Sequence, residues 1–345
     1  MNYILKDENA VYYECGFSCD NVVFLKLGSE AFFITDSRYD TEAKQYIKNA
    51  NVIITERRDM YPKVRELIQS AKIKELIFNP REWSLYEYSE FTKDIDDVEF
   101  KQVHNFSQQK RIIKSEDELD ILRKASQLGA QAFDNFAAYL HEHGLGVAEQ
   151  RLHYEAENIF KNGGELGLSF SPIFAIVSNA AKCHALPSAR DSLGLGDLVL
   201  FDAGVMYKRY CSDRTRTAQF DKNMGFSKKQ TFSNAKQQKI YDIVLKSQEA
   251  GIKKARAGVK ACEVDKACRD VIDKAGFAEF FIHSTGHGVG LDIHELPVIS
   301  SASQTILEEG MVLTVEPGIY FPNEFGVRIE DTVIITNNEA EVIGV

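Results

Sequence analysis

Four carboxylates and one imidazole in the second half of the chain stand in short motifs that could hold metal ions. They are Asp202 in FDAG, Asp213 in CSDRT, His287 in TGHGVG, Glu316 in TVEPG and Glu330 in VRIED. Carboxylates on apolar strands cannot gather in a folded core without a compensating cation, because each unpaired buried charge costs on the order of several kcal/mol. Two divalent metals, ligated by carboxylate oxygens and one imidazole, would supply that charge and lower the pKa of a bridging water toward neutrality. The pattern predicts a dinuclear metallohydrolase.

The two aspartates flank the segment GVMYKRY, which predicts a β-hairpin or a bent pair of strands. Asp202 and Asp213 could therefore both point inward from neighbouring strands. Either residue alone would be ordinary as a solvated loop aspartate. Their occurrence together with the later histidine and glutamates favours the metal site.

Three of the eight histidines, His283, His287 and His294, fall in the segment HSTGHGVGLDIH. A lone histidine is more often a satisfied core or surface residue, but three so close together favour a functional site. The interspersed glycines let the backbone approach a metal and adopt conformations that other residues resist. One imidazole can ligate while the others face substrate as donors to a developing oxyanion.

Alternation along VRIEDTVII places Arg328 and Glu330 on one face of a strand and Val327 and Ile329 on the other. A buried Arg328–Glu330 salt bridge is the alternative to a metal site, although the arginine could then still orient the carboxylate. By the same alternation Asp331 points to the opposite face and is not expected to be a ligand.

The elements that must position these residues fall into two predicted domains, residues 1–110 and 111–345. Between Asn21 and about His104, strand-like runs such as NVVFLKLG and EAFFITD alternate with helical runs, which indicates an open α/β sheet. Ser115 and Glu118 then form a capping box that opens a long amphipathic helix.

Beyond that helix, the pattern of helices followed by strands occurs twice. A helix from Ala148 to about Asn162 precedes strands at PIFAIVS and DLVLFDAGVMYKRYCSDRTRTAQF, and two helices between Thr231 and Ala275 precede strands at MVLTVEPGIYF and GVRIEDTVIIT. Glu316 follows the strand MVLTV and precedes Pro317 and Gly318, which turn the chain. Two α-then-β halves related by pseudo-symmetry would place a ligand site between their sheets.

The composition excludes several other classes of protein. With 345 residues, 44% hydrophobic and 27% charged, the chain is typical of a globular protein. Its formal net charge of -10 disfavours nucleic acids and anionic membranes as partners. No apolar run reaches spanning length, and the first residues, MNYILKDENAVYYECG, do not form a secretory signal, so we expect a cytoplasmic protein. The six cysteines include no CxxC pair and are expected to be reduced thiols.

Taken together, five ordered segments resemble the pita-bread metallopeptidases, the family of methionine aminopeptidase, aminopeptidase P and prolidase. The segments are VSNAAKCHALPS, DLVLFDAGVMYKRYCSDRTRT, HSTGHGVGLDIHELP, GMVLTVEPGIY and GVRIEDTVII. The N-terminal α/β domain is similar to that of aminopeptidase P, prolidase and creatinase. The resemblance implies an α/β N-terminal domain followed by an α+β, pseudo-symmetric pita-bread catalytic domain.

The resemblance also implies a role for each candidate residue. Asp202 would chelate one metal, His287 and Glu316 would complete the other, and Asp213 and Glu330 would bridge both. A metal-bridging hydroxide would attack the scissile carbonyl, with Glu316 handling its proton. His184 would lie beside the substrate amine or leaving nitrogen, His294 would polarise the carbonyl oxygen, and His283 would line the pocket for the residue after the scissile bond. Arg328 is included among the candidate catalytic residues. The two cations are expected to be Mn²⁺, with Co²⁺ or Zn²⁺ as alternatives.

The family's preference for a bond that precedes proline implies a substrate with proline in second position. Some prolidases carry an arginine after the HExP segment to hold the free carboxylate of a dipeptide, whereas HELPVIS has Val298. Because a hydrophobic side chain cannot pair with that carboxylate, an Xaa-Pro aminopeptidase is expected, with an Xaa-Pro dipeptidase as the alternative.

Two further alternatives to a metal-dependent peptidase differ from it in the ligands that they need. A non-catalytic pita-bread module that binds peptides or proteins would usually lack a ligand, and a creatinase-like hydrolase would need no metal; all five ligands are present here.

The segment TDSRYDTEAKQ, with Asp36, Arg38 and Tyr39, resembles a family segment of the N-terminal domain, which often contributes to a dimer. A homodimer is therefore expected. The alternative for this segment is a helix start capped by Asp40 or Thr41.

Overall fold

The computed structural model describes residues 1–344. The chain divides after Arg111 into two compact units. The first, called unit 1, is an α/β unit, and the second, called unit 2, carries all of the candidate ligands. Each unit has its own hydrophobic clusters.

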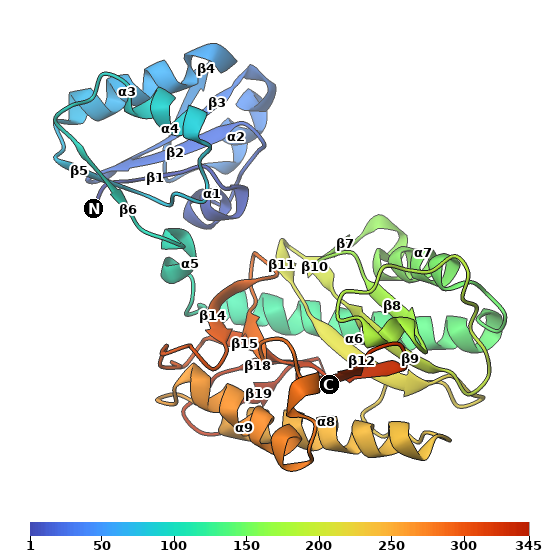
Figure 1. The fold of residues 1–345 in the computed structure, drawn as a ribbon. Helices are drawn as coiled ribbons and strands as arrows, with labels where there is room; N and C mark the ends of the chain where they lie inside the picture. Colours follow the sequence, from blue (N-terminus) through green and yellow to red (C-terminus); the bar gives the residue numbers. More distant parts are fainter. Residues whose placement is uncertain (345) are drawn as a thin grey trace. The chain divides into compact units, whose positions relative to one another are not determined.

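Unit 1 is built on a mixed six-stranded sheet in the order β4-β3-β2-β1-β5-β6 (Figure 1). Its strands are β1 (Tyr3–Leu5), β2 (Val22–Leu27), β3 (Glu30–Asp36), β4 (Asn51–Thr55), β5 (Glu75–Phe78) and β6 (Glu99–Gln102). Its helices are α1 (Glu8–Cys15), α2 (Asp40–Tyr46), α3 (Met60–Ala71), α4 (Leu85–Thr92) and α5 (Phe106–Lys110). The predicted α/β class of this domain is confirmed, and β1 and α1 precede the segment for which elements were predicted.

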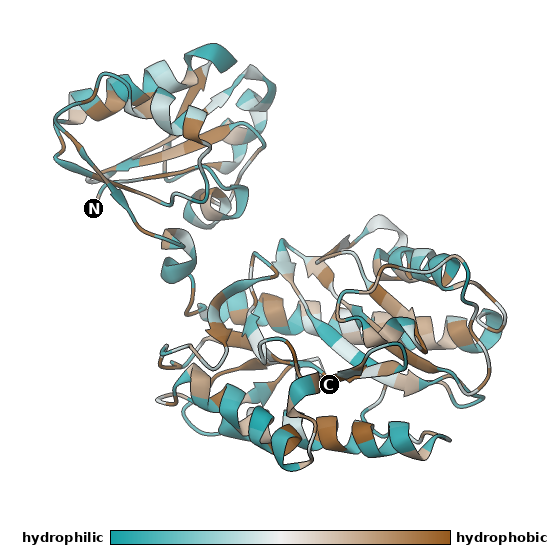
Figure 2. Cartoon of the chain, viewed as in Figure 1, coloured by the Kyte–Doolittle hydropathy of each residue, from teal (hydrophilic) through white to brown (hydrophobic). Residues whose placement is uncertain are grey.

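The central strand β2 shows why the sheet carries helices on both faces. Val22 and Phe24 pack into the cluster that includes residues of α1 and α2, while Val23 and Leu25 pack into the cluster that includes residues of α3 and α4. Successive side chains of a strand point to opposite faces, so a continuous apolar run needs two covering layers. Figure 2 shows the strands of this sheet as mostly hydrophobic.

The segment TDSRYDTEAKQ does not form the capped helix start that was its alternative interpretation. Asp36 ends β3 and caps a single 3-10 turn, Ser37–Tyr39, by accepting the N–H of Arg38 at 3.0 Å. Helix α2 begins directly afterwards at Asp40, and neither Asp40 nor Thr41 is its cap. The alternative with Asp40 or Thr41 as cap is therefore wrong, because the turn lets the chain enter the helix without a new cap.

Unit 2 contains two pairs of long helices and several small sheets (Figure 1). The helices are α6 (Glu116–His143), α7 (Glu149–Phe160), α8 (Ala235–Lys254) and α9 (Ala261–Lys274). The strands of the first half are β7 (Gly167–Leu168), β8 (Ile173–Ile176), β9 (Leu198–Ala203), β10 (Val205–Tyr207), β11 (Tyr210–Cys211) and β12 (Arg214–Gln219). Those of the second half are β13 (Gly286–Gly288), β14 (Glu295–Ile299), β15 (Val312–Val315), β16 (Gly318–Phe321), β17 (Phe325–Arg328), β18 (Asp331–Ile334) and β19 (Glu341–Val342).

Strand β9 lies between the hydrophobic cores of the two halves. Val199 and Phe201 belong to the cluster that includes residues of α6 and α7, whereas Leu198 and Leu200 belong to the cluster that includes residues of α8 and α9. The period of two continues to Asp202, so its side chain follows the face that looks toward the second half. The predicted α+β architecture with two α-then-β halves is confirmed.

Two strand segments are divided in the structure, the first at the turn predicted after Glu316 and the second within a run predicted as one strand. MVLTVEPGIYF divides into β15 and β16, and GVRIEDTVIIT divides into β17 and β18, with the members of each pair in different sheets. The breaks fall at Glu316 and at Glu330. Both glutamates therefore lie where the backbone leaves one sheet for the next.

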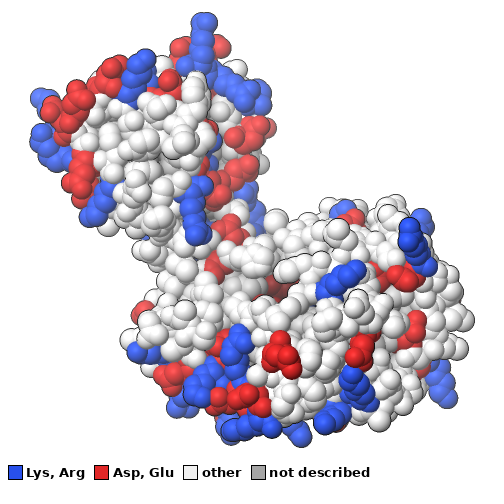
Figure 3. Space-filling model, in the orientation of Figure 1, with Lys and Arg blue, Asp and Glu red and all other residues white. Residues whose placement is uncertain are grey.

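The long helix α6 starts as predicted. Ser115 accepts the N–H of Glu118, and the Glu118 carboxylate in turn accepts the N–H of Ser115 at 2.8 Å. Within residues 1–344, no helix is long and apolar enough to cross a membrane. On the face in Figure 3, acidic and basic side chains are interspersed over each unit.

Candidate metal centre

Asp202 and Asp213 are brought to one face of a three-stranded sheet. Strands β9 and β12 pair antiparallel with Thr215 directly opposite Asp202. Opposed residues share a face, and Asp213 lies two positions before Thr215, so all three side chains point the same way. Between the aspartates, β10 and β11 form the predicted hairpin.

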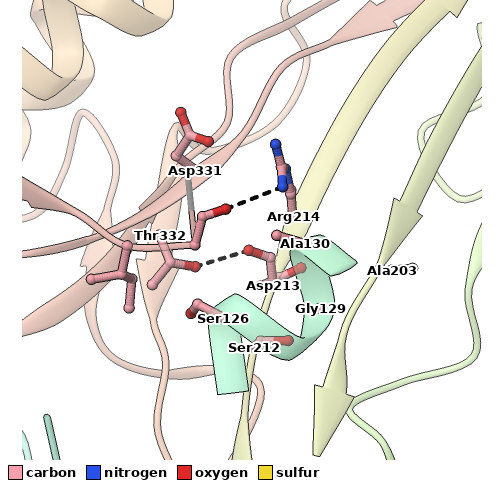
Figure 4. A pocket seen from close by; sticks show the side chains of 11 residues that line it. Ser126, Gly129, Ala130, Ala203, Ser212, Asp213, Arg214, Asp331 and Thr332 are labelled. Atoms are coloured by element: carbon pink, nitrogen blue, oxygen red, sulfur yellow. Dashed lines mark hydrogen bonds between the residues drawn. The ribbon is translucent and has the colours of Figure 1, made fainter. Parts of the chain in front are cut away.

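The backbone of Asp213 is held from behind by neighbouring elements. Thr332 donates its hydroxyl to the Asp213 carbonyl at 2.9 Å, beside a small pocket lined by residues of α6 and β18 (Figure 4). Gly129 of α6 faces Ser212 so closely that a Cβ there would lie 2.9 Å from its hydroxyl oxygen. Absence of a side chain at Gly129 thus lets the helix lie directly against the chain at Asp213.

His287 and Glu316 come from neighbouring strands joined by one hydroxyl. The N–H of His287 donates to Thr314 Oγ1 at 3.1 Å, and the same hydroxyl donates to Glu316 Oε1 at 3.2 Å. The N–H of Glu316 donates to the carbonyl of Thr285 at 2.8 Å. Because Thr314 and Thr285 hold both backbones, the imidazole and the carboxylate project into the same space.

The candidate ligand atoms converge. Asp213, His287 and Glu330 each offer a ligand atom, and these atoms all lie within 4.8 Å of one another. His287 Nε2 lies 3.6 Å from Asp213 Oδ2 and 3.4 Å from Glu316 Oε1. Side chains separated by more than a hundred residues in sequence therefore form one buried cluster.

Two carboxylate oxygens of the cluster have no partner among the described residues. Asp202 Oδ1 and Glu330 Oε1 are buried and accept no hydrogen bond there. Their companion oxygens are occupied: Arg328 Nη2 donates to Asp202 Oδ2 at 2.6 Å, and Thr215 Oγ1 donates to Glu330 Oε2 at 2.7 Å. An unpaired buried oxygen is costly, so each of these two atoms is poised for a ligand that the protein itself does not supply.

The pKa values of the carboxylates in the cluster also favour a bound cation. Burial raises the pKa of Asp213 and of Glu330 well above the usual range, and the charges of neighbouring carboxylates raise both further. Burial also raises the pKa of Glu316 to about 8. A divalent cation among these groups would favour their charged forms and offset this repulsion.

His287 is presented in the form that a metal binds. Burial lowers its pKa, so the ring is neutral near pH 7. Its Nδ1 lies 3.0 Å from the carbonyl of Gly288, and because a carbonyl only accepts, Nδ1 carries the proton. Nε2, the atom beside Asp213 and Glu316, is therefore left with its lone pair.

Arg328 is buried and pairs with Asp202 rather than with Glu330. Besides Asp202, its guanidinium donates to the Tyr320 hydroxyl at 2.8 Å and to Thr215 Oγ1 at 3.0 Å. The strand predicted to align Arg328 with Glu330 is interrupted between them, so the alternative of an Arg328–Glu330 salt bridge is not found and Arg328 pairs with Asp202. Through Thr215 the arginine still orients the Glu330 carboxylate.

His283 is held by Tyr320 at the edge of the cluster. Its Nδ1 lies 2.8 Å from the carbonyl of Ser284 and its Nε2 lies 3.0 Å from the Tyr320 hydroxyl. Nδ1 must donate to the carbonyl, so the hydroxyl donates to Nε2 and accepts from Arg328. Burial lowers the pKa of His283 to about 4, which keeps this ring neutral.

The remaining two candidate histidines, His184 and His294, are exposed and lie at the rim of the carboxylate cluster. His294 packs against His287 with ring centroids 4.4 Å apart, and the partial burial that results lowers its pKa. His184 follows the short turn Asn179–Ala181 and is close enough that its charge contributes to the lowered pKa of both His283 and His294. The structure thus gathers all the candidate histidines around one cluster of carboxylates.

Several residues that hold the site were not predicted. Tyr320 could have been noticed because it stands four residues after Glu316 in EPGIY. Thr215 and Thr314 gave no signal, since a threonine in a strand is ordinary. Their hydroxyl contacts depend on which strands become neighbours, and that information is absent from local sequence.

The donor set fits a pair of divalent cations. It offers carboxylate oxygens and one neutral imidazole, two of the oxygens are unpaired, and the buried negative charges need compensation. Asp202, Asp213, His287, Glu316 and Glu330 would hold such ions. Oxygen-rich ligation of this kind is suited to hard cations.

Comparison with known proteins identifies the family. Residues 120–337 match the family description "Metallopeptidase family M24", and residues 2–113 match "Creatinase/Prolidase N-terminal domain". The chain is 34% identical to an Xaa-Pro dipeptidase of Pyrococcus horikoshii over 97% of this chain and 90% of the relative.

Solved structures agree with this assignment. The fold matches an Xaa-Pro dipeptidase from Bacillus anthracis with a TM-score of 0.90 and 34% identity, over 99% of this chain and 92% of that one. It matches an X-Pro aminopeptidase from Thermotoga maritima with a TM-score of 0.87 and 28% identity, over 100% of this chain and 95% of that one. The chain accordingly belongs to metallopeptidase family M24 and carries the N-terminal domain of the creatinases and prolidases.

Proposed function

We propose that this metallopeptidase is an Xaa-Pro dipeptidase, which hydrolyses the bond before proline in dipeptides. The observation that carries the proposal is the buried cluster of Asp213, His287 and Glu330, together with the unpaired oxygens of Asp202 and Glu330. The relatives supply the substrate class, because the Pyrococcus and Bacillus proteins similar over nearly the whole chain are named Xaa-Pro dipeptidases.

This proposal reverses the order of the two activities expected from sequence. Sequence favours the aminopeptidase because Val298 cannot pair with the free carboxylate of a dipeptide. Val298 is 45% exposed on β14, and a missing charge at one position does not exclude a basic group elsewhere in the site. The aminopeptidase remains the second candidate, supported by the similarity to the Thermotoga maritima X-Pro aminopeptidase and by Val298 itself.

In the proposed reaction, Asp202, Asp213, His287, Glu316 and Glu330 hold two divalent cations, expected to be Mn²⁺. When bound, the cations supply Lewis-acid polarisation and make a water molecule nucleophilic at neutral pH. The Glu316 carboxylate takes a proton from the attacking water molecule and returns it to the leaving nitrogen of proline. His294 donates to the substrate carbonyl oxygen, where negative charge develops.

The other side chains orient the substrate. His184 contacts the substrate amine or the leaving nitrogen, and His283 lines the proline pocket. Because Nε2 of His283 is occupied by the Tyr320 hydroxyl, this ring contributes shape rather than a proton. Arg328 keeps the Asp202 carboxylate in place. The cytoplasmic location and the homodimer stay predictions.

One assay tests the proposal. The metal-free protein, reconstituted with Mn²⁺, is given Ala-Pro and Ala-Pro-Ala in parallel. Hydrolysis of Ala-Pro at a kcat/KM at least about 10-fold above that of the tripeptide is expected, since remote binding energy from the terminal carboxylate is used in the dipeptide. Faster cleavage of the tripeptide would establish the aminopeptidase instead.

Two controls concern the chemistry. A chelator should abolish turnover and Mn²⁺ should restore it. Glu316→Gln should lower kcat by about 100-fold or more, because removing a positioned acid–base group has effects of that order. Activity that survives both changes would rule out metal-dependent peptide hydrolysis.

A further inference from the structure

The histidine hairpin, defined as β13, the turn that follows it, and β14, sets the distance between a proposed ligand and a proposed substrate contact. His287 lies within β13, and His294 directly precedes β14. The strands pair antiparallel with Gly288 opposite Glu295, and the two imidazole rings pack 4.4 Å apart. A change in this hairpin would therefore move both imidazoles.

The carboxylate of Glu295 lies beneath the turn of the hairpin. Its Oε1 accepts the N–H of Asp292 at 3.0 Å. Gly290 lies so close that a Cβ there would be 2.6 Å from Glu295 Oε2. The Gly290 N–H donates to the carbonyl of Asp292 at 3.1 Å, which closes the turn above the carboxylate. Glu295 thus fills the space that gives this turn its shape.

A lysine distant in sequence forms an ion pair with this carboxylate. Lys114 Nζ lies 2.9 Å from Glu295 Oε2, and the side chains are 1% and 0% exposed. The lysine belongs to the segment just before α6, where its N–H donates to the Gly310 carbonyl at 2.9 Å. Ile113 forms an isolated bridge with Met311, so this segment is fixed to unit 2 at its own backbone.

The complete burial of the pair makes it sensitive to change. Removing one member of a buried ion pair leaves an uncompensated charge, whereas replacing both by apolar groups is often neutral for stability. The contribution of the pair to folding can therefore be separated experimentally from its contribution to the site.

We propose that Lys114 and Glu295 are positioning residues for His287 and His294. The ion pair fixes the Glu295 carboxylate, the carboxylate fixes the turn, and the turn fixes the spacing of the two imidazoles. The inference rests on the proposed function, in which His287 binds a metal and His294 contacts substrate. It assigns a role in the site to two residues that contact neither metal nor substrate.

The test compares the Lys114→Met single variant with the Lys114→Met, Glu295→Leu double variant in the full chain. Four quantities are measured: the melting temperature, the affinity of the metal-free protein for Mn²⁺ by calorimetry, and kcat and KM for Ala-Pro. The single variant should lose stability and activity together. The double variant should recover the melting temperature, yet kcat should stay about 10-fold or more below wild type and Mn²⁺ should bind at least about 3-fold more weakly, because small misplacements cost rate steeply.

A second, more exposed ion pair of unit 2 provides a control for the loss of two paired charges. Arg123 binds Glu341 with two hydrogen bonds of 2.8 Å, between α6 and β19 and away from the histidine hairpin. Arg123→Met with Glu341→Leu should leave kcat and Mn²⁺ affinity unchanged. A loss of kcat in this control equal to that of the Lys114 and Glu295 variant would overturn the assignment.

The other possible results also test the positioning role of Lys114 and Glu295. Wild-type kcat and Mn²⁺ affinity in the stable double variant would show that the pair serves folding alone. If the double variant does not fold, Glu295→Gln, which keeps the shape and a carbonyl acceptor, decides in its place: unchanged kcat and Mn²⁺ affinity would overturn the proposal. If wild type does not cleave Ala-Pro, the proposed substrate is wrong. The Mn²⁺ affinities of the variants and wild type then test the positioning role of Lys114 and Glu295 on their own.

Discussion

At the scale of single residues, the Tyr320 hydroxyl connects two other side chains of the site. It accepts a hydrogen bond from Arg328 at 2.8 Å and donates to His283 Nε2 at 3.0 Å. Arg328 in turn holds Asp202. One hydroxyl therefore links a proposed metal ligand to the proposed wall of the proline pocket.

Replacing Tyr320 by Phe should lower kcat/KM for Ala-Pro by about 10- to 100-fold, because hydrogen bonds to charged groups contribute about 1.5–3 kcal/mol. The ring remains, so packing is kept. Steady-state kinetics at saturating Mn²⁺ measure the effect. Tyr241→Phe is the control, since the buried Tyr241 donates its hydroxyl to the Lys228 carbonyl and makes no contact with the ligands. Equal kinetics for Tyr320→Phe and wild type would remove the hydroxyl from the site.

At the scale of elements, helix α9 holds the loop that leads into β13. Asp265 is fully buried, accepts the Thr285 hydroxyl at 2.8 Å and pairs with Arg269 at the same distance. Arg269 donates to the carbonyls of Phe281 and His283. One turn of a helix thus supports His283 and, through the Thr285 carbonyl, the backbone of Glu316.

Asp265→Asn should therefore destabilise unit 2 by about 3 kcal/mol, the lower range for breaking a buried ion pair, because Arg269 is partly exposed. Urea unfolding measures the loss. Asp270→Asn, on the same helix and paired with Lys266 in solvent, should lower the free energy of unfolding far less. Similar losses in the two variants would contradict the role given to Asp265.

The elements also show how far sequence alone could lead. The capping box of Ser115 and Glu118 and the Asp202–Asp213 hairpin follow from local patterns, and the structure has both. The turn after Glu316 was predicted from Pro317 and Gly318, and the structure has it. The interruption at Glu330 was not predicted, because an apolar run gives no sign that its ends join different sheets. The partner of Arg328 and the Lys114–Glu295 pair depend on contacts between distant segments, which periodicity does not encode.

At the scale of the whole molecule, the two units have separate cores and should respond separately to acid and to metal. In unit 1, the hydrogen bond from Arg38, opposed by partial burial, holds the pKa of Asp36 well below its usual range. A carboxylate with a lowered native pKa stabilises the fold above its unfolded pKa of about 3.9, and this contribution is lost as the pH falls toward the native value.

Asp36→Asn should accordingly lower the melting temperature of the unit 1 transition at pH 7, and the difference from wild type should shrink below about pH 4. Calorimetric scans between pH 3 and 7 test this, both with Mn²⁺ and with a chelator. Chelation should lower only the unit 2 transition. A difference between variant and wild type that is constant across this pH range would contradict the contribution of the Asp36 charge.

The proposed metal ligands are divided between the two halves of unit 2, which has a consequence for incompletely folded copies of the chain. Asp202 and Asp213 come from the first half, and His287, Glu316 and Glu330 come from the second. Since neither half supplies all five proposed ligands, a truncated or half-folded copy would lack the complete proposed metal site. Under this proposal, completed folding of unit 2 would be a precondition of hydrolysis.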